Sequence, residues 1–399
     1  MGFCLKEKIL MREGRRPTVY SVSFPDPTST LGVREDLAVG MVANVAIGEG
    51  VLVRNDFDRV SIFDRPILNA TWNTQKGRWE AFTMQGEQAF TWRPQEPYRE
   101  VLYRCRPFWY RLENGEHGLT RVSVSPDALE GFTLAPMFKN GRDFVYRPVF
   151  EMALGSDGLP HSRAGLAVTR GIGLTTVMDQ ARSYDPRARV ESVDDWFSDA
   201  LLQLVEFARW DLHTLMRGNC GALAKSGVAA QSVSASSGCI EDGKPLIWRG
   251  KENAWQNVCS FLCDILLQKH IAADGSYTST ICRLRDMSRF DGTLNAHYEP
   301  LAPYFPSLVR GELPVGAFAL QNGLFYPALE ATGNIAPKAY AYIQSQWGEE
   351  YPIMVGVGGG TAADMIPTTR GPSPFHWEAV QRTQSRENRF GGRLILDEA

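Results

Sequence analysis

The sequence lacks a long apolar run. Nowhere in its 399 residues do about 18 apolar residues follow one another, the length that a membrane-spanning helix needs. The first residues, Met1 to Lys8, also lack the apolar core of a signal peptide. We therefore expect a chain that is synthesised in a cytoplasm and is not inserted into a membrane.

Cysteine and histidine are too scarce and too scattered to indicate a disulfide framework or a metal site. The seven cysteines are odd in number and irregularly spaced, which favours reduced thiols. No two of the six histidines stand at a metal-ligand spacing such as i, i+4. A Gly-x-Ser-x-Gly nucleophile motif is also missing. We accordingly predict no cofactor, no metal and no catalytic residue.

Charge of one sign is not in excess, because 42 basic and 45 acidic residues give a net charge of −3. Such a balance does not point to nucleic acid or to an anionic membrane as the main partner. The glycine-rich stretches do not complete a phosphate loop either. Gly171-Ile-Gly173 lacks the third glycine of a dinucleotide site, and Gly356–Gly360 lacks the following Lys-Ser/Thr.

Aromatic residues, in contrast, are plentiful: the chain has 10 Trp, 13 Tyr and 20 Phe. This content suits a β-rich protein or an aromatic binding surface. Residues 1–92 have the patterns of β-strands, and Ala70–Asn73 and Arg78–Met84 flank a turn, which predicts a hairpin. Because the chain is longer than one average domain, we predict a β-rich N-terminal attachment domain at 1–92 and a second domain at 93–399.

Two helices are predicted in the second domain. Thr175–Tyr184 has apolar residues at helical spacing and stops before Pro186. Ser192 and Asp195 form a start like a capping box for a longer helix that reaches about Arg217. The apolar residues of the longer helix form one stripe, so we expect an amphipathic helix.

A charged and amide-rich turn lies between Trp248 and Val258 and runs directly into an apolar segment. Arg249 and Glu252 can form an ion pair, and the asparagine side chains can bond free backbone groups. A buried network of this kind fixes one local geometry, and the alternative is a surface turn before a strand. The polar residues of this motif are Arg249, Glu252, Asn253 and Asn257.

This turn resembles the Arg-Gly-x-Glu-Asn-x-(Trp)-Gly-Asn-Val-Trp signature of the C-type-lectin-like fold. The formylglycine-generating enzyme family, the variable proteins of diversity-generating retroelements and many bacteriophage tail proteins share that fold. Phe108–Tyr110, Gly131–Phe138, Asp143–Glu151 and Phe390–Leu396 are similar, in this order, to segments of phage tail proteins. The resemblance implies an α+β C-type-lectin-like domain, in which a twisted antiparallel sheet has two flanking helices and long loops. It also implies that the last strand, Phe390–Leu396, pairs with residues 100–112.

The same resemblance implies a bacteriophage tail tip or fibre protein that belongs to the virion. Its N-terminal region would join other tail proteins, and its loops would bind a protein or glycan receptor on the host bacterial surface. Relatives of this kind are often trimers, so a homotrimer is expected. The richest loop material is 291–389, where packing within the loops is the alternative role of each residue. The expected ligand contacts are Trp347, Tyr351, Arg370, Phe375, His376 and Trp377.

Two other functions stay open. The first is a cysteine oxidoreductase of the formylglycine-generating type, which uses a copper-binding cysteine pair near the end of its domain. The last cysteine is Cys282, so the C-terminal third cannot supply such a pair, and Cys259 and Cys263 lie on a strand that the family fold packs inward. The second is a purely structural tail or collar protein that touches no receptor.

Overall fold

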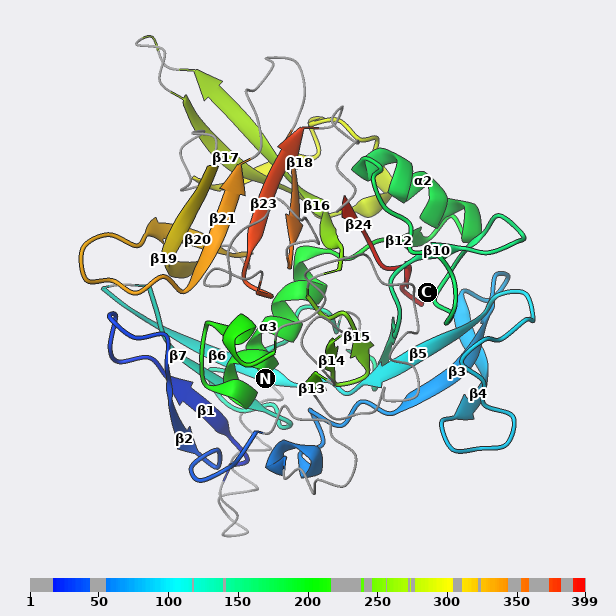
Figure 1. Ribbon diagram of the computed structural model, residues 1–399, viewed down its shortest axis with the longest axis horizontal. Coiled ribbons are helices and arrows are strands. Elements are labelled where there is room, and N and C mark those ends of the chain that lie inside the picture. Colours follow the sequence, from blue (N-terminus) through cyan, green and yellow to red (C-terminus); the bar gives the residue numbers. More distant parts are fainter. Residues whose placement is uncertain are drawn as a thin grey trace.

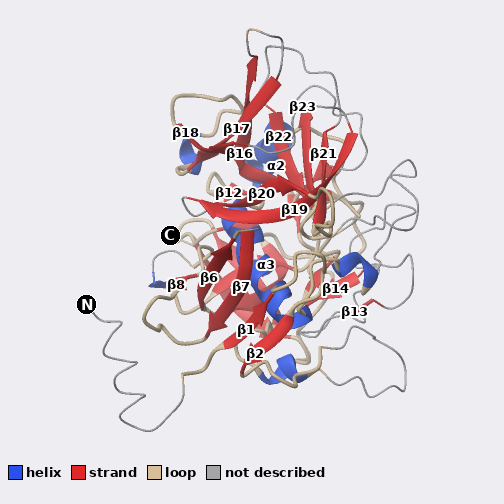
Figure 2. Cartoon of the chain, turned by 90° about the vertical axis from the view of Figure 1, so that its left-hand side faces the viewer, coloured by secondary structure: helices blue, strands red, loops and turns tan. Residues whose placement is uncertain are grey.

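The computed structural model is dominated by β-strands. Strands hold 42% of the described residues and helices 13%. The strands gather in two groups of sheets, and helix α3 (Val193–Phe207) lies between them (Figures 1 and 2). The described residues are 17–43, 55–116, 118–138, 141–216, 238–239, 246–255, 257–271, 273, 277–303, 311–321, 324–343, 353–358, 373–381 and 390–398.

The first group consists of two antiparallel sheets. One has the order β2 (Val33–Asp36), β1 (Tyr20–Ser23), β7 (Gly118–Ser125), β6 (Trp109–Gly115) and β8 (Thr133–Leu134). The other has the order β4 (Arg78–Met84), β3 (Ile67–Asn73), β5 (Arg99–Cys105) and β9 (Val145–Pro148). The predicted hairpin is confirmed as β3 and β4. Because β1 pairs with β7 and β3 with β5, both sheets continue across the boundary expected at residue 92.

The second group is a nine-stranded sheet that is nearly closed. Its order is β18 (Tyr298–Pro303), β17 (Tyr277–Leu284), β16 (Cys259–Ile271), β22 (Ile353–Val357), β23 (Trp377–Gln381), β21 (Ala339–Ile343), β19 (Gly311–Gln321) and β20 (Leu324–Glu330). The ninth strand, β24 (Phe390–Gly391), runs parallel to β16 and pairs with its start.

Short elements connect the two groups. The small sheets are β10 (Ala153–Leu154) with β11 (Pro160–His161), β12 (Ala188–Arg189) with β25 (Ile395–Leu396), and β13 (Gly238–Cys239) with β14 (Leu246–Trp248) and β15 (Lys251–Glu252). The remaining helices are α2 (Leu174–Tyr184) and the 3-10 turns Asp56–Arg59, Leu212–Thr214 and Met287–Arg289. In the part of the chain that the structure describes, no helix is long and apolar enough to cross a membrane.

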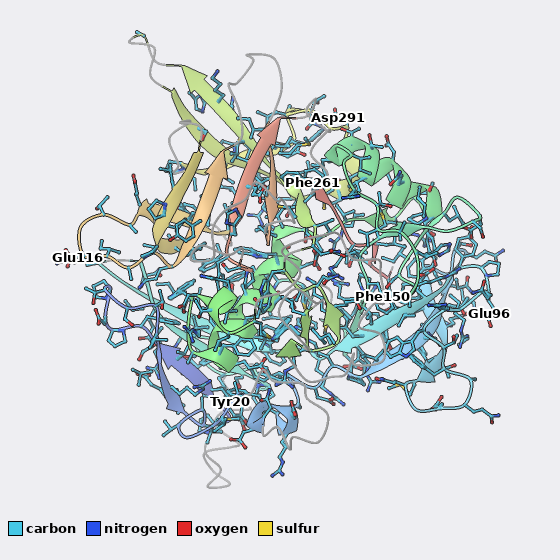
Figure 3. The ribbon with its side chains drawn as sticks, viewed as in Figure 1. Tyr20, Glu96, Glu116, Phe150, Phe261 and Asp291 are labelled. Carbon is cyan, nitrogen blue, oxygen red and sulfur yellow. The ribbon has the colours of Figure 1, made fainter. Side chains whose placement is uncertain are left out.

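Two hydrophobic clusters make up the core. Phe150 belongs to the larger cluster, which surrounds α3, and Phe261 belongs to the smaller one, which lies around α2. Figure 3 shows both side chains inside the molecule, whereas Glu96 and Glu116 lie at its edge. The predicted helix at 175–184 is confirmed as α2.

Helix α3 begins and ends for clear local reasons. Ser192 accepts a hydrogen bond from the backbone of Asp195, and the Asp195 carboxylate accepts one from the backbone of Ser192, so the predicted capping box is confirmed. The helix ends ten residues before the expected Arg217. Ala208 ends it with a left-handed backbone at φ 52°, and its N–H bonds the carbonyl of Leu204. All residues of the helix are buried, including the polar ones.

The predicted C-type-lectin-like α+β fold class is wrong. Strands dominate the structure, its largest sheet is nearly closed, and α2 and α3 are the only α-helices among the described residues. The physical reason lies in α3, which the resemblance places on one flank of a sheet as an amphipathic helix. Its acidic side chains are instead buried against basic side chains, so the helix is enclosed.

The strand pairing expected from the resemblance is also wrong. At the end of the chain β24 pairs with β16 and β25 with β12, while β5 pairs with β3 and β9. The segment 291–389, expected to be loop-rich, carries β18 to β23. Pro314 and Pro327 lie within β19 and β20, where bulges interrupt the pairing, so proline there does not mark a loop.

The acidic residues of α3 are neutralised by cations from several other segments. Each of its four carboxylates meets an arginine that belongs to β9, to β17, to the loop before β3 or to the turn after β14. A single buried charge is very unfavourable, so each pair requires both partners in place. The pairs are Arg283–Asp194 at 2.5 Å, Arg147–Asp195 at 2.8 Å, Arg65–Asp199 at 2.7 Å and Arg249–Glu206 at 2.7 Å.

Removal of one partner from such a pair should destabilise the whole fold. In Arg249→Met, the fully buried Glu206 loses its cation, and we expect the free energy of unfolding to fall by about 3–5 kcal/mol. Arg289→Met is the control, because Arg289 and its partner Asp286 are both more than 60% exposed. Denaturant unfolding of both variants measures the difference, and equal stability of the two would contradict this role for α3.

Candidate functional site

The turn that the sequence singled out is a buried polar junction and not a surface turn. Arg249, Glu252, Asn253 and Asn257 are all buried, so the expected burial is confirmed, but the expected ion pair between Arg249 and Glu252 is not the one that the described residues form. Arg249 bonds Glu206 of α3 and also Asp58, at 2.6 Å. Asn253 and Asn257 both donate side-chain hydrogen bonds to the carboxylate of Glu151. The sequence did not indicate these acidic partners, because Asp58, Glu151 and Glu206 lie far from the turn along the chain.

Three non-glycine residues of the turn have left-handed backbones: Arg249, Asn253 and Asn257 have φ of 48°, 50° and 63°. Asparagine adopts this conformation more readily than most residues, whereas an arginine there is strained. The ion pairs of Arg249 offset the strain, and Arg393 donates hydrogen bonds to the carbonyls of Glu252 and Asn253. This junction therefore joins α3, the turn and the end of the chain, and its buried groups leave little room for a ligand.

The expected ligand-binding residues do not form an exposed surface where they are described. Phe375, His376 and Trp377 are buried. Phe375 packs edge-on against Trp210, and Trp377 packs edge-on against Trp196. The other three expected contacts, Trp347, Tyr351 and Arg370, lie outside the described residues.

Cys259 and Cys263, the cysteines considered for thiol chemistry, lie inside the core. Both are fully buried on β16. Burial raises the pKa of the Cys263 thiol far above its usual value, so the reactive thiolate form is suppressed at neutral pH.

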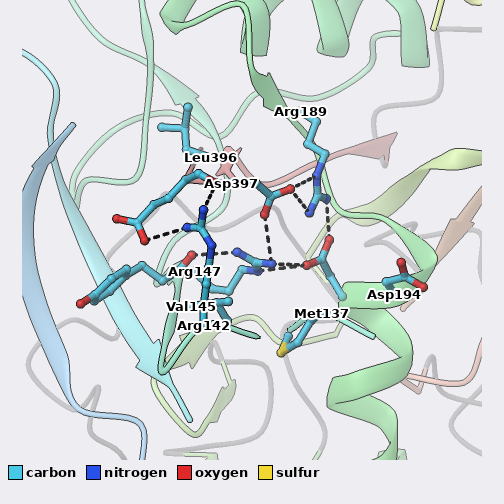
Figure 4. Close-up of a pocket in the computed structure, with 11 residues that line it drawn as sticks. Met137, Arg142, Val145, Arg147, Arg189, Asp194, Leu396 and Asp397 are labelled. Carbon is cyan, nitrogen blue, oxygen red and sulfur yellow. Dashed lines mark hydrogen bonds and ion pairs between the residues drawn. The ribbon is translucent and has the colours of Figure 1, made fainter. Parts of the chain in front are cut away.

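A pocket of about 90 Å³ lies where the end of the chain meets β9, β12 and α3 (Figure 4). Arg189 bonds Asp195 at 2.5 Å and Asp397 at 2.8 Å, and Arg147 contacts the same two carboxylates. Burial alone would raise the pKa of Asp195, but Arg189 and Arg147 outweigh it and hold that pKa well below its usual value. Since the charges are matched, this inner pocket holds the carboxyl-terminal segment in place.

An open groove of about 650 Å³ adjoins this pocket and shares Arg142, Tyr146 and Glu398 with it. Phe82 is 46% exposed and stacks on Tyr146 with 5.1 Å between ring centroids. We call this surface the terminal groove. Its lining residues are Arg78, Trp79, Glu80, Phe82, Arg142, Asp143, Phe144, Tyr146 and Glu398.

Charged groups surround the aromatic rings of the terminal groove. Glu398 accepts hydrogen bonds from Arg142 at 3.0 Å and from the backbone N–H of Trp79 at 2.8 Å. Arg104 and Arg106 lie over the ring of Phe144, at 4.5 Å and 5.2 Å from its centroid. Flat apolar faces beside guanidinium groups can bind a ring-shaped ligand and fix its orientation by hydrogen bonds.

Sequence reasoning missed the terminal groove because a bulge creates it. In β4, Ala81 has φ 54°, and the pairing with β3 shifts register between Asn69 and Thr71. Such a bulge redirects the neighbouring side chain, here Phe82, away from the regular alternation of the strand. The signal available in the sequence is weak, because Asp143 and Tyr146 stand out only as members of the segment Asp143–Glu151 in the resemblance.

Comparison with known proteins adds no relative. No protein-family model matches the chain, and no curated protein matches it. The terminal groove is therefore interpreted from its own contacts.

The junction around Glu151 predicts a pH-dependent stability. Burial raises the pKa of Glu151 from 4.5 to about 7, even though Arg393 and the asparagine hydrogen bonds act in the opposite direction. Between these two values the folded protein holds a proton that the unfolded chain releases. The protonation of Glu151 thus contributes fully to the free energy of unfolding below a pH of about 4.5. This contribution, roughly 3 kcal/mol, is lost as the pH rises to about 7.

Denaturant unfolding at several pH values tests this dependence. Glu151→Gln cannot titrate, so its stability should decline less than that of the wild type between pH 5 and 7.5, whatever its absolute stability. Other titrating groups contribute equally to both proteins and cancel in the comparison. If the free energy of unfolding falls equally with pH in both proteins, Glu151 is ionised throughout this range and the prediction is wrong.

Proposed function

We propose that this chain is a bacteriophage virion protein of the tail tip or fibre, which attaches to the host bacterial surface through the terminal groove. The observation that carries the proposal is the exposed Phe82–Tyr146 pair beside the Arg142–Glu398 ion pair. Aromatic residues and arginine dominate the energy of binding surfaces. Phe82 and Tyr146 stand on β4 and β9 of one sheet, and Arg142 lies just before β9, so the aromatic part of the site is formed before a ligand arrives.

Placement of the site in the terminal groove replaces the loop surface that the sequence suggested. Support for a tail protein comes from the order of segments that resemble tail proteins, from Phe108–Tyr110 to Asp143–Glu151. The last of these segments contributes Asp143, Phe144 and Tyr146 to the groove. The proposed attachment does not depend on a lectin-like fold.

A second surface suits attachment to the rest of the tail. β2 is the last strand at one side of its sheet, and the residues around it expose apolar side chains. Exposed apolar groups on an edge strand are typical of sites that contact another protein. β2 and β4 lie at opposite sides of the molecule in Figure 1, so one side can join the tail while the other faces the cell. The exposed residues are Leu31, Val33, Leu37, Val39 and Val42.

The proposed mechanism is reversible attachment at several sites at once. One open groove holds a ligand weakly, but several copies of the protein on one particle raise the overall affinity by about 10²–10⁴. A homotrimer, expected from the resemblance, would supply three such grooves and stays a prediction.

Binding of purified protein to cells of the bacterial host tests the site. Phe82→Ala removes the exposed ring, and we expect at least tenfold weaker binding, because an aromatic anchor contributes about 1–3 kcal/mol. Leu154→Ala is the matched control, since Leu154 is a similarly exposed apolar residue outside the groove. Unchanged binding of Phe82→Ala would refute the groove, and failure of the wild type to bind would favour a purely structural tail protein.

Incorporation into virions tests the second surface. Val39 is 66% exposed, so Val39→Asp should fold normally but place a charge in the contact with the tail. We expect particles that contain little of this variant, while Leu154→Asp, changed at a site away from β2, is incorporated normally. Wild-type amounts of Val39→Asp in purified particles would exclude this surface as the attachment site.

A further inference from the structure

We propose that the terminal groove selects an acidic saccharide, and that Glu398 occupies the position of the ligand carboxylate while the groove is empty. The inference rests on the proposed function and specifies its ligand. Three features carry it: the way Glu398 is bound, the balance of charge around the groove, and the shape of the aromatic surface.

Glu398 is bound as a free carboxylate would be. One of its oxygens accepts from Arg142 at 3.0 Å and the other from the backbone N–H of Trp79 at 2.8 Å. Arg142 also donates a hydrogen bond to the main-chain carbonyl of Glu398. An arginine together with a backbone N–H is a strong binding site for a carboxylate. Glu398 reaches this site from a short segment that follows β25.

Replacement of the Glu398 carboxylate by the carboxylate of a ligand changes the free energy little at this position. The side chains of Arg142 and Glu398 are about one fifth exposed, so solvent and ligand reach the pair. An incoming carboxylate reproduces the hydrogen bonds that Glu398 accepts, so the exchange leaves neither donor unpaired. Asp397 stays bound to Arg189 and Arg147, so Glu398 can leave the groove without release of the preceding residues.

The charges near the groove favour an anion once Glu398 has left. The acidic side chains that remain are Glu80 and Asp143, and Glu80 is already paired with Lys76 and Arg78. Among the residues that line the groove, Arg78 and Arg142 match these two carboxylates in number. Arg104 and Arg106, which lie over the ring of Phe144, add two positive charges beside the groove. This excess of positive charge attracts an acidic ligand and repels a basic one.

The aromatic surface favours a sugar ring over a peptide. Phe82 and Tyr146 are stacked with 25° between their planes and offer a flat apolar face, against which the C–H face of a pyranose can pack. A peptide would bind most readily by pairing with β4, which is the edge of its sheet. The bulge at Ala81 interrupts the regular spacing of backbone groups along that edge, so an added peptide strand cannot pair along its whole length.

The test uses a panel of uronic-acid-rich bacterial capsular polysaccharides, each in its native form and after reduction of its carboxyl groups to hydroxymethyl groups. We expect the full-length protein to bind at least one native polysaccharide at least tenfold more tightly than its reduced form. Arg142→Gln should remove this difference. Glu398→Gln should bind the native form severalfold more tightly, because residue 398 then has no carboxylate that competes with the ligand for Arg142. Arg289→Gln, changed at an exposed ion pair outside the groove, is the control.

The outcomes separate this inference from the proposed function. Equal binding of native and reduced polysaccharides, or binding to none of the native ones, overturns the inference. If host-cell binding still depends on Phe82 in that case, the groove remains an attachment site for another ligand. Displacement of a bound polysaccharide by an acidic hexapeptide of Asp and Glu, but not by free glucuronic acid, would show a peptide site and also overturn it.

Discussion

The structure depends on the ion pairs that surround a buried acidic helix. Four carboxylates of α3 pair with arginines from four separate segments, so the helix can be buried only when these segments occupy their places. Hydrophobic burial supplies most of the favourable free energy of folding, but it is not directional. Ion pairs in the interior require particular partners and therefore select one arrangement among several compact ones. In this chain they fix how the two groups of sheets meet across α3.

The same pairs position the terminal groove. Asp195 of α3 binds Arg147 and Arg189, and these two arginines bind Asp397 near the end of the chain. The last residues of the chain are thereby fixed beside β9, and Glu398 reaches the edge of β4. The proposed binding site thus combines a sheet from the first part of the chain with its last residues. A rigid scaffold of this kind presents its side chains without a cost of ordering on binding, which suits repeated weak attachment.

Local structure was predictable where local chemistry determines it. The hairpin of β3 and β4, the helix α2 and the capping box of α3 follow from turn residues, helical spacing and Ser192 with Asp195, and the structure confirms them. Burial of the polar residues Arg249, Glu252, Asn253 and Asn257 was also predicted, but their partners Glu206, Asp58 and Glu151 were not. The fold class was not, because the partners of the α3 carboxylates are distant in sequence and cannot be read from its periodicity. The groove was missed for a similar reason: it requires the bulge at Ala81 and the return of the chain end to β4.

Native-state hydrogen exchange tests the central role of α3 most directly, because it measures the free energy at which each segment opens. If the buried ion pairs hold the two groups of sheets together, the amides of residues 197–207 should open only with global unfolding. The amides of β9 and β17, which carry Arg147 and Arg283, should open at the same free energy as those of α3. Exchange of α3 at a clearly lower free energy than these strands would contradict the account, because the sheets would then remain folded without the helix between them.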